Sequence, residues 1–144
     1  MLEVMCQPIE DKIVTISRAQ GSLAGDAHVD VLLKSLERLV GQVDRLTLDV
    51  FKLSLHSSKA NLSRYLLEKI ECWRYLVSSN GTQFKHPDKE AMAYVIRFGG
   101  PEPELIFNYR TEFNQLWDNQ QWKKDYGYRV VFPDGDATGI VIEL

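Results

Sequence analysis

The sequence predicts an α/β fold, because segments that alternate like strands are followed, several times along the chain, by segments with helical spacing. Loops rich in Gly, Pro, Ser and Asn separate these segments. The length of 144 residues suits one domain with one hydrophobic core, and 44% apolar with 26% charged residues is typical of globular proteins. We expect a single domain over residues 1–144, with a mixed sheet of about five strands and helices on one face.

The first part of the chain combines strand-like patterns with a helix. Residues 12–17 alternate between apolar and polar side chains, and residues 22–25 form a short strand or turn that leads to Asp26. From residue 29 to residue 43 the apolar side chains recur at helical spacing, which predicts an amphipathic helix. Asp26 precedes this helix, and its carboxylate can accept hydrogen bonds from the free amides of the first turn.

The middle of the chain repeats this order of strand and helix. Residues 46–55 alternate as a strand with an irregularity near Phe51. Asn61 or Ser63 can cap the helix that follows, because both carry side-chain oxygens that accept from backbone amides. Residues 74–78 are apolar enough for a short buried strand.

The last third predicts two more helices, one strand and a hairpin. A helix over residues 87–96 begins at its proline and is terminated by two glycines. Residues 104–109 are a strand, and residues 111–117 a helix capped by its threonine. Residues 128–132 and 139–144 alternate around a Pro-Asp-Gly turn, which predicts a β-hairpin. The predicted order is β-α-β-α-β-α-β followed by this hairpin.

Charge and composition argue against several classes of function. The net charge is −3 and the pI about 5.6, so nucleic acid is an improbable partner. No apolar run has the length of a membrane span, and the N-terminus lacks the pattern of a signal peptide. Cys6 and Cys72 share no metal-binding or redox spacing, which favours free thiols in a reducing compartment. We therefore expect a cytoplasmic protein.

The three histidines each lie in a short polar segment beside a predicted strand end. They are His28 in Gly-Asp-Ala-His, His56 in Leu-His-Ser-Ser, and His86 in Lys-His-Pro-Asp. A single histidine at such a position is more often a capping or surface residue than a ligand. The order and spacing of the three segments are more specific than any one of them.

Four short segments follow one another along the chain: Gly25-Asp26, His56-Ser57-Ser58, Ser79-Asn80-Gly81 and His86-Pro87. Over residues 22–109 this order resembles the C-terminal half of metallo-β-lactamase-fold hydrolases, in the branch that includes the soluble domain of bacterial DNA-uptake channel proteins. That branch typically carries T-G-D, H-H-G-S and S-x-G-x-N-x-x-G-H-P. The resemblance implies half of an αββα sandwich, with the three motif-bearing loops at one rim of the sheet.

The resemblance also implies roles for individual residues. Asp26 matches the carboxylate that bridges two metal ions, and His86 the last histidine ligand of the second ion. His56 matches the segment near the scissile group and is the candidate catalytic residue. Zinc is the implied cofactor, because a carboxylate and imidazoles hold zinc pairs that generate hydroxide at neutral pH. His28 and Asn80 are candidates for supporting contacts at such a site.

The strand end at residues 108–110 adds two further candidates from its own chemistry. Asn108 and Arg110 follow a predicted strand, so they can lie on the same rim as His86. A guanidinium at this position suits a phosphate-containing substrate. A solvated strand end is the simpler alternative for both residues.

Several parts of the family pattern are missing from this chain. No H-x-H-x-D-H cluster occurs, and Leu55, Ser57 and Lys85 replace a histidine and two glycines of the family motifs. The two matched ligand positions, Asp26 and His86, are fewer than the three protein ligands of a catalytic zinc site. We therefore expect a truncated, catalytically incomplete hydrolase-like protein that acts through binding or assembly.

Two alternatives stay open. A metal-dependent hydrolase of phosphodiesters or esters can be completed by oligomerisation or by a partner chain. A small interaction or immunity-type accessory protein is the other, because the C-terminal segment is rich in aromatic residues that anchor interfaces or close the core. These residues are Trp117, Trp122, Tyr126, Tyr128 and Phe132.

Half a sandwich leaves one sheet face without its partner sheet, which favours a homodimer. A complementing partner chain is an alternative to the homodimer. In a second alternative, the strand at 12–17 and the C-terminal hairpin cover that face within one chain.

Overall fold

The computed structural model describes residues 3–5, 16–17, 20–23, 34, 45–53, 62–79, 85–135, 137 and 139–143. Its helices are α2 (Arg64–Glu68), α3 (Lys89–Phe98) and α4 (Gln120–Tyr126), with a 3-10 helix, η3 (Gln115–Asp118). Its strands are β1 (Glu3–Met5), β2 (Ile16–Ser17), β3 (Gln20–Leu23), β4 (Leu46–Thr47), β5 (Val50–Lys52), β6 (Ile70–Glu71), β7 (Arg74–Val77), β8 (Glu104–Phe107), β9 (Arg129–Val131) and β10 (Val141–Glu143).

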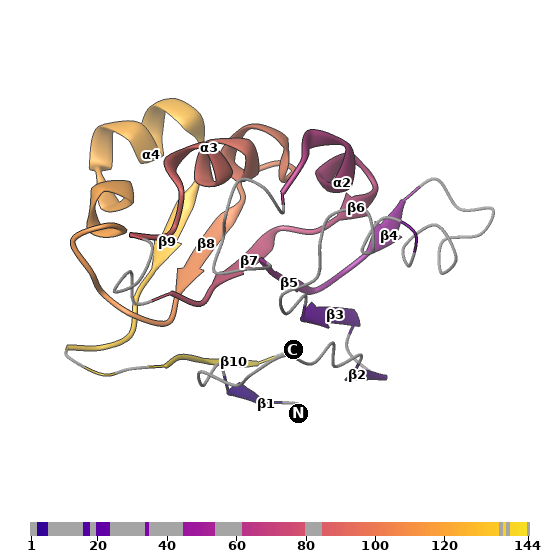
Figure 1. The fold of residues 1–144 in the computed structure, drawn as a ribbon, viewed down its shortest axis with the longest axis horizontal. Helices are drawn as coiled ribbons and strands as arrows, with labels where there is room; N and C mark the ends of the chain where they lie inside the picture. The colour runs from indigo at the N-terminus through magenta and orange to yellow at the C-terminus, as the bar shows by residue number, and fades with distance from the viewer. Residues whose placement is uncertain are drawn as a thin grey trace.

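A six-stranded sheet with the order β2-β3-β5-β7-β8-β9 forms the centre of the described structure (Figure 1). Every neighbouring pair from β3 to β9 is parallel, and β2 pairs antiparallel with β3. Parallel strands need crossover connections, and helices supply most of these in α/β proteins. The prediction of an α/β fold with a mixed sheet is confirmed.

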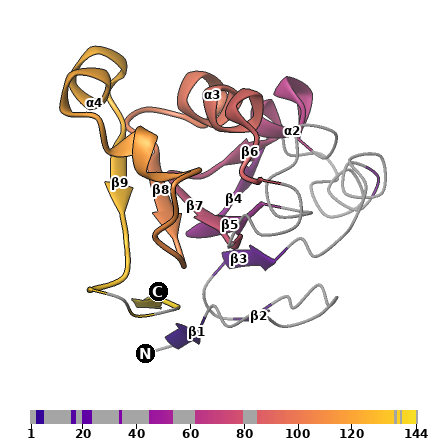
Figure 2. The ribbon, with the colours of Figure 1, turned by 60° about the vertical axis from the view of Figure 1, so that its left-hand side comes forward.

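Side chains of the central strands alternate between two apolar layers. Phe51, Tyr75 and Leu105 are paired neighbours across β5, β7 and β8, and they belong to the larger core cluster. This cluster includes buried residues of α2 and α3, which lie on one side of the sheet in both ribbon views (Figures 1 and 2). Alternation of period two therefore positions the helices on one face, as predicted.

The second layer lies on the opposite face. Leu76 pairs with Ile106 in the sheet, and both are buried together with Val50 and with Ile142 of β10. β10 pairs antiparallel with β1, and this ribbon lies on the side of the sheet away from the helices (Figures 1 and 2). The second face is thus covered, at these residues, by the chain's own C-terminal strand.

Tyr75 connects the sheet to the end of α3. The residue is fully buried, and its hydroxyl donates to the carbonyl oxygen of Gly99 at 2.9 Å. The carbonyl oxygen of Cys72 lies 3.2 Å from the same hydroxyl. A Cβ atom on Gly99 would lie 2.5 Å from the carbonyl oxygen of Val95 and 2.9 Å from the ring of Tyr75. Only glycine therefore permits this close approach between helix end and ring.

The helix α2 begins where a capping residue was predicted. The side chain of Ser63 accepts a hydrogen bond from the amide of Leu66 at 3.1 Å. For α3, the N-cap is Asp88, so Pro87 precedes the helix instead of standing in its first turn. The strands predicted at 74–78 and 104–109 are confirmed as β7 and β8 with shorter ends.

The predicted C-terminal hairpin is wrong. β9 pairs in parallel with β8, and β10 pairs with β1 near the N-terminus. The Pro-Asp-Gly segment therefore joins strands of two different sheets, because long-range pairing outweighs the local turn signal.

Other boundaries also differ from the predictions. The strand expected at 46–55 is divided into β4, which pairs with β6, and β5 in the central sheet. The helix expected at 111–117 is the short η3, and α4 was not predicted. Of the helix expected at 29–43, the structure describes only Lys34, which is helical.

None of the helices in the described part of the chain is both long and apolar enough to cross a lipid bilayer.

We predict that Tyr75→Phe lowers the free energy of unfolding by about 1–3 kcal/mol, because buried carbonyl oxygens lose their hydroxyl donor. Urea denaturation followed by circular dichroism measures this change. The matched control is Tyr65→Phe, since Tyr65 is 47% exposed and its change should be within about 0.5 kcal/mol. Equal losses in the two variants would contradict the role assigned to Tyr75.

A second prediction concerns the buried thiol of Cys72. Burial raises the pKa of this thiol from 9.0 to about 11. At pH 8 the reactive thiolate is then about 100-fold scarcer in the folded than in the unfolded chain. We expect iodoacetamide to modify Cys72 slowly in native protein and rapidly in urea, as measured by peptide mass spectrometry. Rapid modification of the native protein would contradict this assignment.

Candidate functional site

The carboxyl ends of β7 and β8 converge at one edge of the sheet. Because the two strands are parallel neighbours, Ser78 and Ser79 at the end of β7 lie beside Asn108 at the end of β8. β3 and β5, which precede Asp26 and His56 in the chain, are parallel to them. Functional loops collect at this edge in parallel α/β sheets.

Asn108 links three segments at this edge. Its side-chain amide donates to the hydroxyl of Ser78 at 2.9 Å, and its backbone amide donates to the carbonyl of Val77 at 3.3 Å. Its own carbonyl accepts from the amide of Gly139 at 2.8 Å. The side-chain oxygen of Asn108 is buried and accepts no hydrogen bond within the described structure. A buried acceptor of this kind is rare and marks a place where a donor can bind.

The segment 85–88 is attached to the same edge. Ser79 donates from its hydroxyl to the backbone carbonyl of His86 at 3.3 Å, and Nδ1 of His86 lies 3.2 Å from a carboxylate oxygen of Asp88. A neutral imidazole that donates from Nδ1 carries its lone pair on Nε2. Metal-binding histidines commonly have such a carboxylate partner, which fixes the tautomer and the ring orientation.

Lys85 has a left-handed backbone conformation, with φ of +55°. This region is uncommon for residues with a Cβ atom and is favoured by glycine. The chain therefore turns sharply just before His86.

Arg110 extends from the end of β8 over an aromatic ring. Its guanidinium carbon lies 4.2 Å from the ring centre of Phe132, which in turn stacks on Phe107 at 5.1 Å. The contact is a cation–π interaction at an exposed residue. Arg110 thus follows β8 as predicted, but its charge is directed onto a ring.

Three of the candidate residues have described positions and four do not. His86, Asn108 and Arg110 lie at or next to the edge just defined. The other four lie outside the described residues, so their shared rim with His86 stays a prediction: Asp26, His28, His56 and Asn80.

The described residues do not form a metal site by themselves. Among them, no three His, Cys, Asp or Glu side chains are grouped so that they could hold an ion. His86 and Asp88 supply at most one imidazole and one carboxylate that contact each other. A zinc ion at this edge would therefore need ligands from outside the described residues.

Two contacts at this edge are not predicted from the sequence. The sequence indicates Ser78 only as part of a strand, although its hydroxyl accepts a hydrogen bond from the side-chain amide of Asn108. Asp88 stands two residues after His86, and its carboxylate contacts the imidazole. The available signal was the His-Pro-Asp string itself, in which an acidic residue follows closely on a candidate ligand.

Comparison with protein-family models, with curated proteins and with solved structures found no match for this chain.

We predict that Lys85→Gly leaves stability unchanged or raises it by up to about 1 kcal/mol, because glycine adopts positive φ without the Cβ penalty. Lys85→Val should lower stability by about 1–3 kcal/mol, since a β-branched residue is strained there. The matched control is Lys89→Gly in the first turn of α3, which should cost about 0.5–1 kcal/mol. Thermal denaturation orders the three variants, and a stabilised Lys85→Val would refute the assigned geometry.

Proposed function

We propose that this chain is a metallo-β-lactamase-like half-domain with an incomplete hydrolytic site, which acts through binding or assembly at the carboxyl edge of its sheet. One observation carries the proposal. The parallel strands β3, β5 and β7 end shortly before the chain segments whose motifs resemble that family. Segment 85–88 also returns to this edge through the hydrogen bond between Ser79 and His86.

The backbone at Lys85 supports the resemblance independently of residue identity. Relatives in the proposed family carry glycine directly before the His-Pro pair, and this chain carries lysine there. The φ of +55° at Lys85 is a conformation that suits glycine. A turn that suits glycine but carries lysine is consistent with a family loop that has lost part of its original role.

The number of ligands argues for an incomplete site. Asp26 and His86 are the two positions that the motifs match to metal ligands, whereas a catalytic zinc takes three protein ligands and a water. If zinc binds, the two residues would hold it and the ion would supply a Lewis acid. The H-x-H-x-D-H cluster that completes the site in the family does not occur in the sequence.

A second candidate is a metal-dependent hydrolase that a further chain completes. The pairing of His86 with Asp88 favours it, because a carboxylate that orients an imidazole is typical of functional metal ligands. This candidate requires that a second polypeptide bring the missing histidines to the carboxyl edge.

The structure removes the main argument for the homodimer that the sequence suggested. It was expected because half a sandwich would expose an apolar sheet face. Leu76 and Ile106 on that face are 1% and 3% exposed, and Ile142 of the same chain belongs to their cluster. These residues need no second copy of the chain to cover them. We therefore propose that any assembly uses another surface of the protein.

We predict that the isolated chain, purified without chelator, contains zinc well below one equivalent and does not hydrolyse bis-p-nitrophenyl phosphate. Inductively coupled plasma mass spectrometry measures the metal, absorbance measures turnover, and light scattering measures the mass of the same sample. The reason is that two matched ligands hold a catalytic ion too weakly.

His86→Ala and Asp26→Ala are the informative variants, and Lys89→Ala is the control near the same segment. Stoichiometric zinc and turnover that both variants abolish would reject the incomplete-site proposal. If such turnover appears only in samples with the mass of an oligomer, the enzyme completed by a further chain takes its place.

A further inference from the structure

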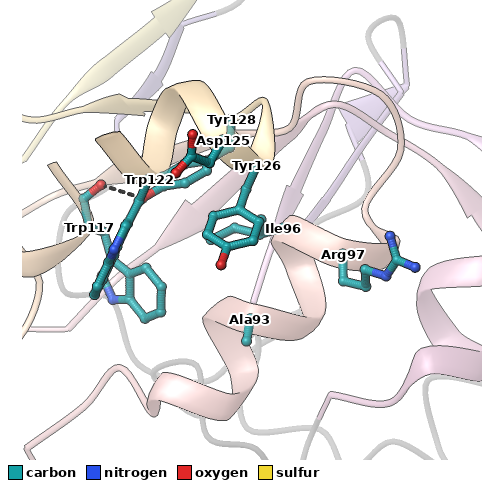
Figure 3. A pocket seen from close by; sticks show the side chains of 8 residues that line it. All are labelled: Ala93, Ile96, Arg97, Trp117, Trp122, Asp125, Tyr126 and Tyr128. Atoms are coloured by element: carbon teal, nitrogen blue, oxygen red, sulfur yellow. Dashed lines mark hydrogen bonds between the residues drawn. The ribbon is translucent and has the colours of Figure 1, made fainter. Parts of the chain in front are cut away.

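A cavity of about 560 Å³ lies between α3, η3 and α4, on the helical side of the sheet. Figure 3 shows its lining side chains, which come mostly from the C-terminal part of the chain. Four of the lining residues are aromatic, and the full set of eight is Ala93, Ile96, Arg97, Trp117, Trp122, Asp125, Tyr126 and Tyr128. Its volume lies within the range of ordinary small-ligand sites.

Two of the aromatic residues are fixed by the protein core. Trp117 and Tyr128 are 7% and 3% exposed, and the Tyr128 hydroxyl donates to the carbonyl of Trp117 at 2.8 Å (Figure 3). Burial raises the pKa of Tyr128 to about 12, so its hydroxyl keeps the proton of this hydrogen bond at neutral pH. The inner wall of the cavity is therefore preformed.

The other two aromatic residues are exposed on α4. Trp122 and Tyr126 are 40% and 66% exposed, and α4 has no buried residue. They stand four positions apart, so they share one face of the helix. The ring centre of Trp122 lies 6.0 Å from that of Trp117, and Asn119 caps the helix by accepting from the amide of Trp122 at 3.0 Å. Burial in the core does not explain the position of these exposed rings, whereas contact with a ligand would explain it.

The lining of the cavity carries one charge of each sign, and that of Asp125 favours a cation. Asp125 is among the lining residues and accepts a hydrogen bond from the side chain of Gln121 at 2.7 Å, while the guanidinium of Arg97 points away from the ring of Tyr126 (Figure 3). The cation–π contacts found among the described residues involve other rings, those of Tyr65, Trp73, Phe98 and Phe132. The negative faces of the cavity rings thus have no cation from the described chain over them.

We propose that this cavity binds a small molecule that carries a methylated ammonium group. Aromatic rings attract such a cation through their quadrupoles, and methyl groups make it cheaper to remove from water than a bare ammonium. Asp125 adds a charge of opposite sign, and the neighbouring Arg97 opposes the ligand. The site lies apart from the carboxyl edge of the sheet and does not depend on the proposed function.

The chain carries its own internal control for a test, because it has three tryptophans. Trp117 and Trp122 line the cavity, whereas Trp73 does not and is 42% exposed, close to the 40% of Trp122. Titration of ¹⁵N-labelled protein with tetramethylammonium chloride, at constant ionic strength set by sodium chloride, should shift the indole signals of Trp117 and Trp122. The signal of Trp73 should stay in place.

Three substitutions in the cavity and one control substitution outside it test the assigned roles. Trp122→Leu should weaken binding by at least about fivefold, whereas Trp73→Leu should leave it unchanged. Asp125→Asn should weaken binding by about two- to fivefold, and Arg97→Gln should strengthen it by a similar factor, since it removes a like charge.

Each opposite result overturns the proposal. The outcomes are shifts of all three indole signals together, no shift up to about 100 mM cation, or loss of binding in Arg97→Gln. Because all four substituted side chains are exposed, misfolding is readily excluded by the spectrum of each variant. Indole, a neutral aromatic compound, serves as the competing probe, and binding of indole alone would assign the cavity to a stacking ligand instead.

Discussion

The contact between Tyr75 and Gly99 sets the distance between the sheet and its central helix. The buried hydroxyl of Tyr75 donates to the carbonyl at the end of α3, and its ring occupies the space that a Cβ atom on Gly99 would need. Phe51 packs edge-on against the same ring, with centres 6.4 Å apart, so the contact continues into β5. A polar group buried this deeply is stable only because it is hydrogen-bonded, and the helix cannot shift without leaving it unpaired. The position of α3 therefore follows from this one residue more than from any surface interaction.

The helix α3 contributes residues to both candidate sites. Its N-cap, Asp88, contacts the imidazole of His86 at the carboxyl edge, and its buried residues Met92 and Val95 pack into the core. Its outer face contributes the exposed residues Ala93 and Arg97 to the aromatic cavity. A helix held at its C-terminus by Tyr75 thus presents its beginning to one site and its exposed side to the other. The two sites differ in chemistry, since one offers an imidazole and a buried amide oxygen and the other offers aromatic faces.

The sequence was sufficient where local chemistry decides the structure. Ser63 caps α2 because its hydroxyl lies within reach of the amide three residues later, and β7 and β8 show the apolar character of buried parallel strands. It was insufficient where distant segments decide. The pairing of β10 with β1 and of β9 with β8 cannot be read from the Pro-Asp-Gly segment between β9 and β10. The helix α4 escaped prediction because none of its residues is buried, so it carries no apolar periodicity. At the candidate site, His-Pro-Asp marked His86, whereas the role of Ser78 depended on a partner 30 residues away.

The aromatic cavity and the motifs at the carboxyl edge of the sheet come from different parts of the chain. The resemblance to the hydrolase family covers residues 22–109, whereas the four cavity rings come from Trp117 to Tyr128. The rings of Trp122 and Tyr126 stand on a helix that contributes nothing to the core, so α4 could be lost with little effect on the burial of the central sheet. The exposed rings of this helix are available for contacts with a ligand outside the fold. Binding through this cavity therefore does not require a complete hydrolytic site, so the cavity can hold its ligand whether or not the carboxyl edge of the sheet is catalytic.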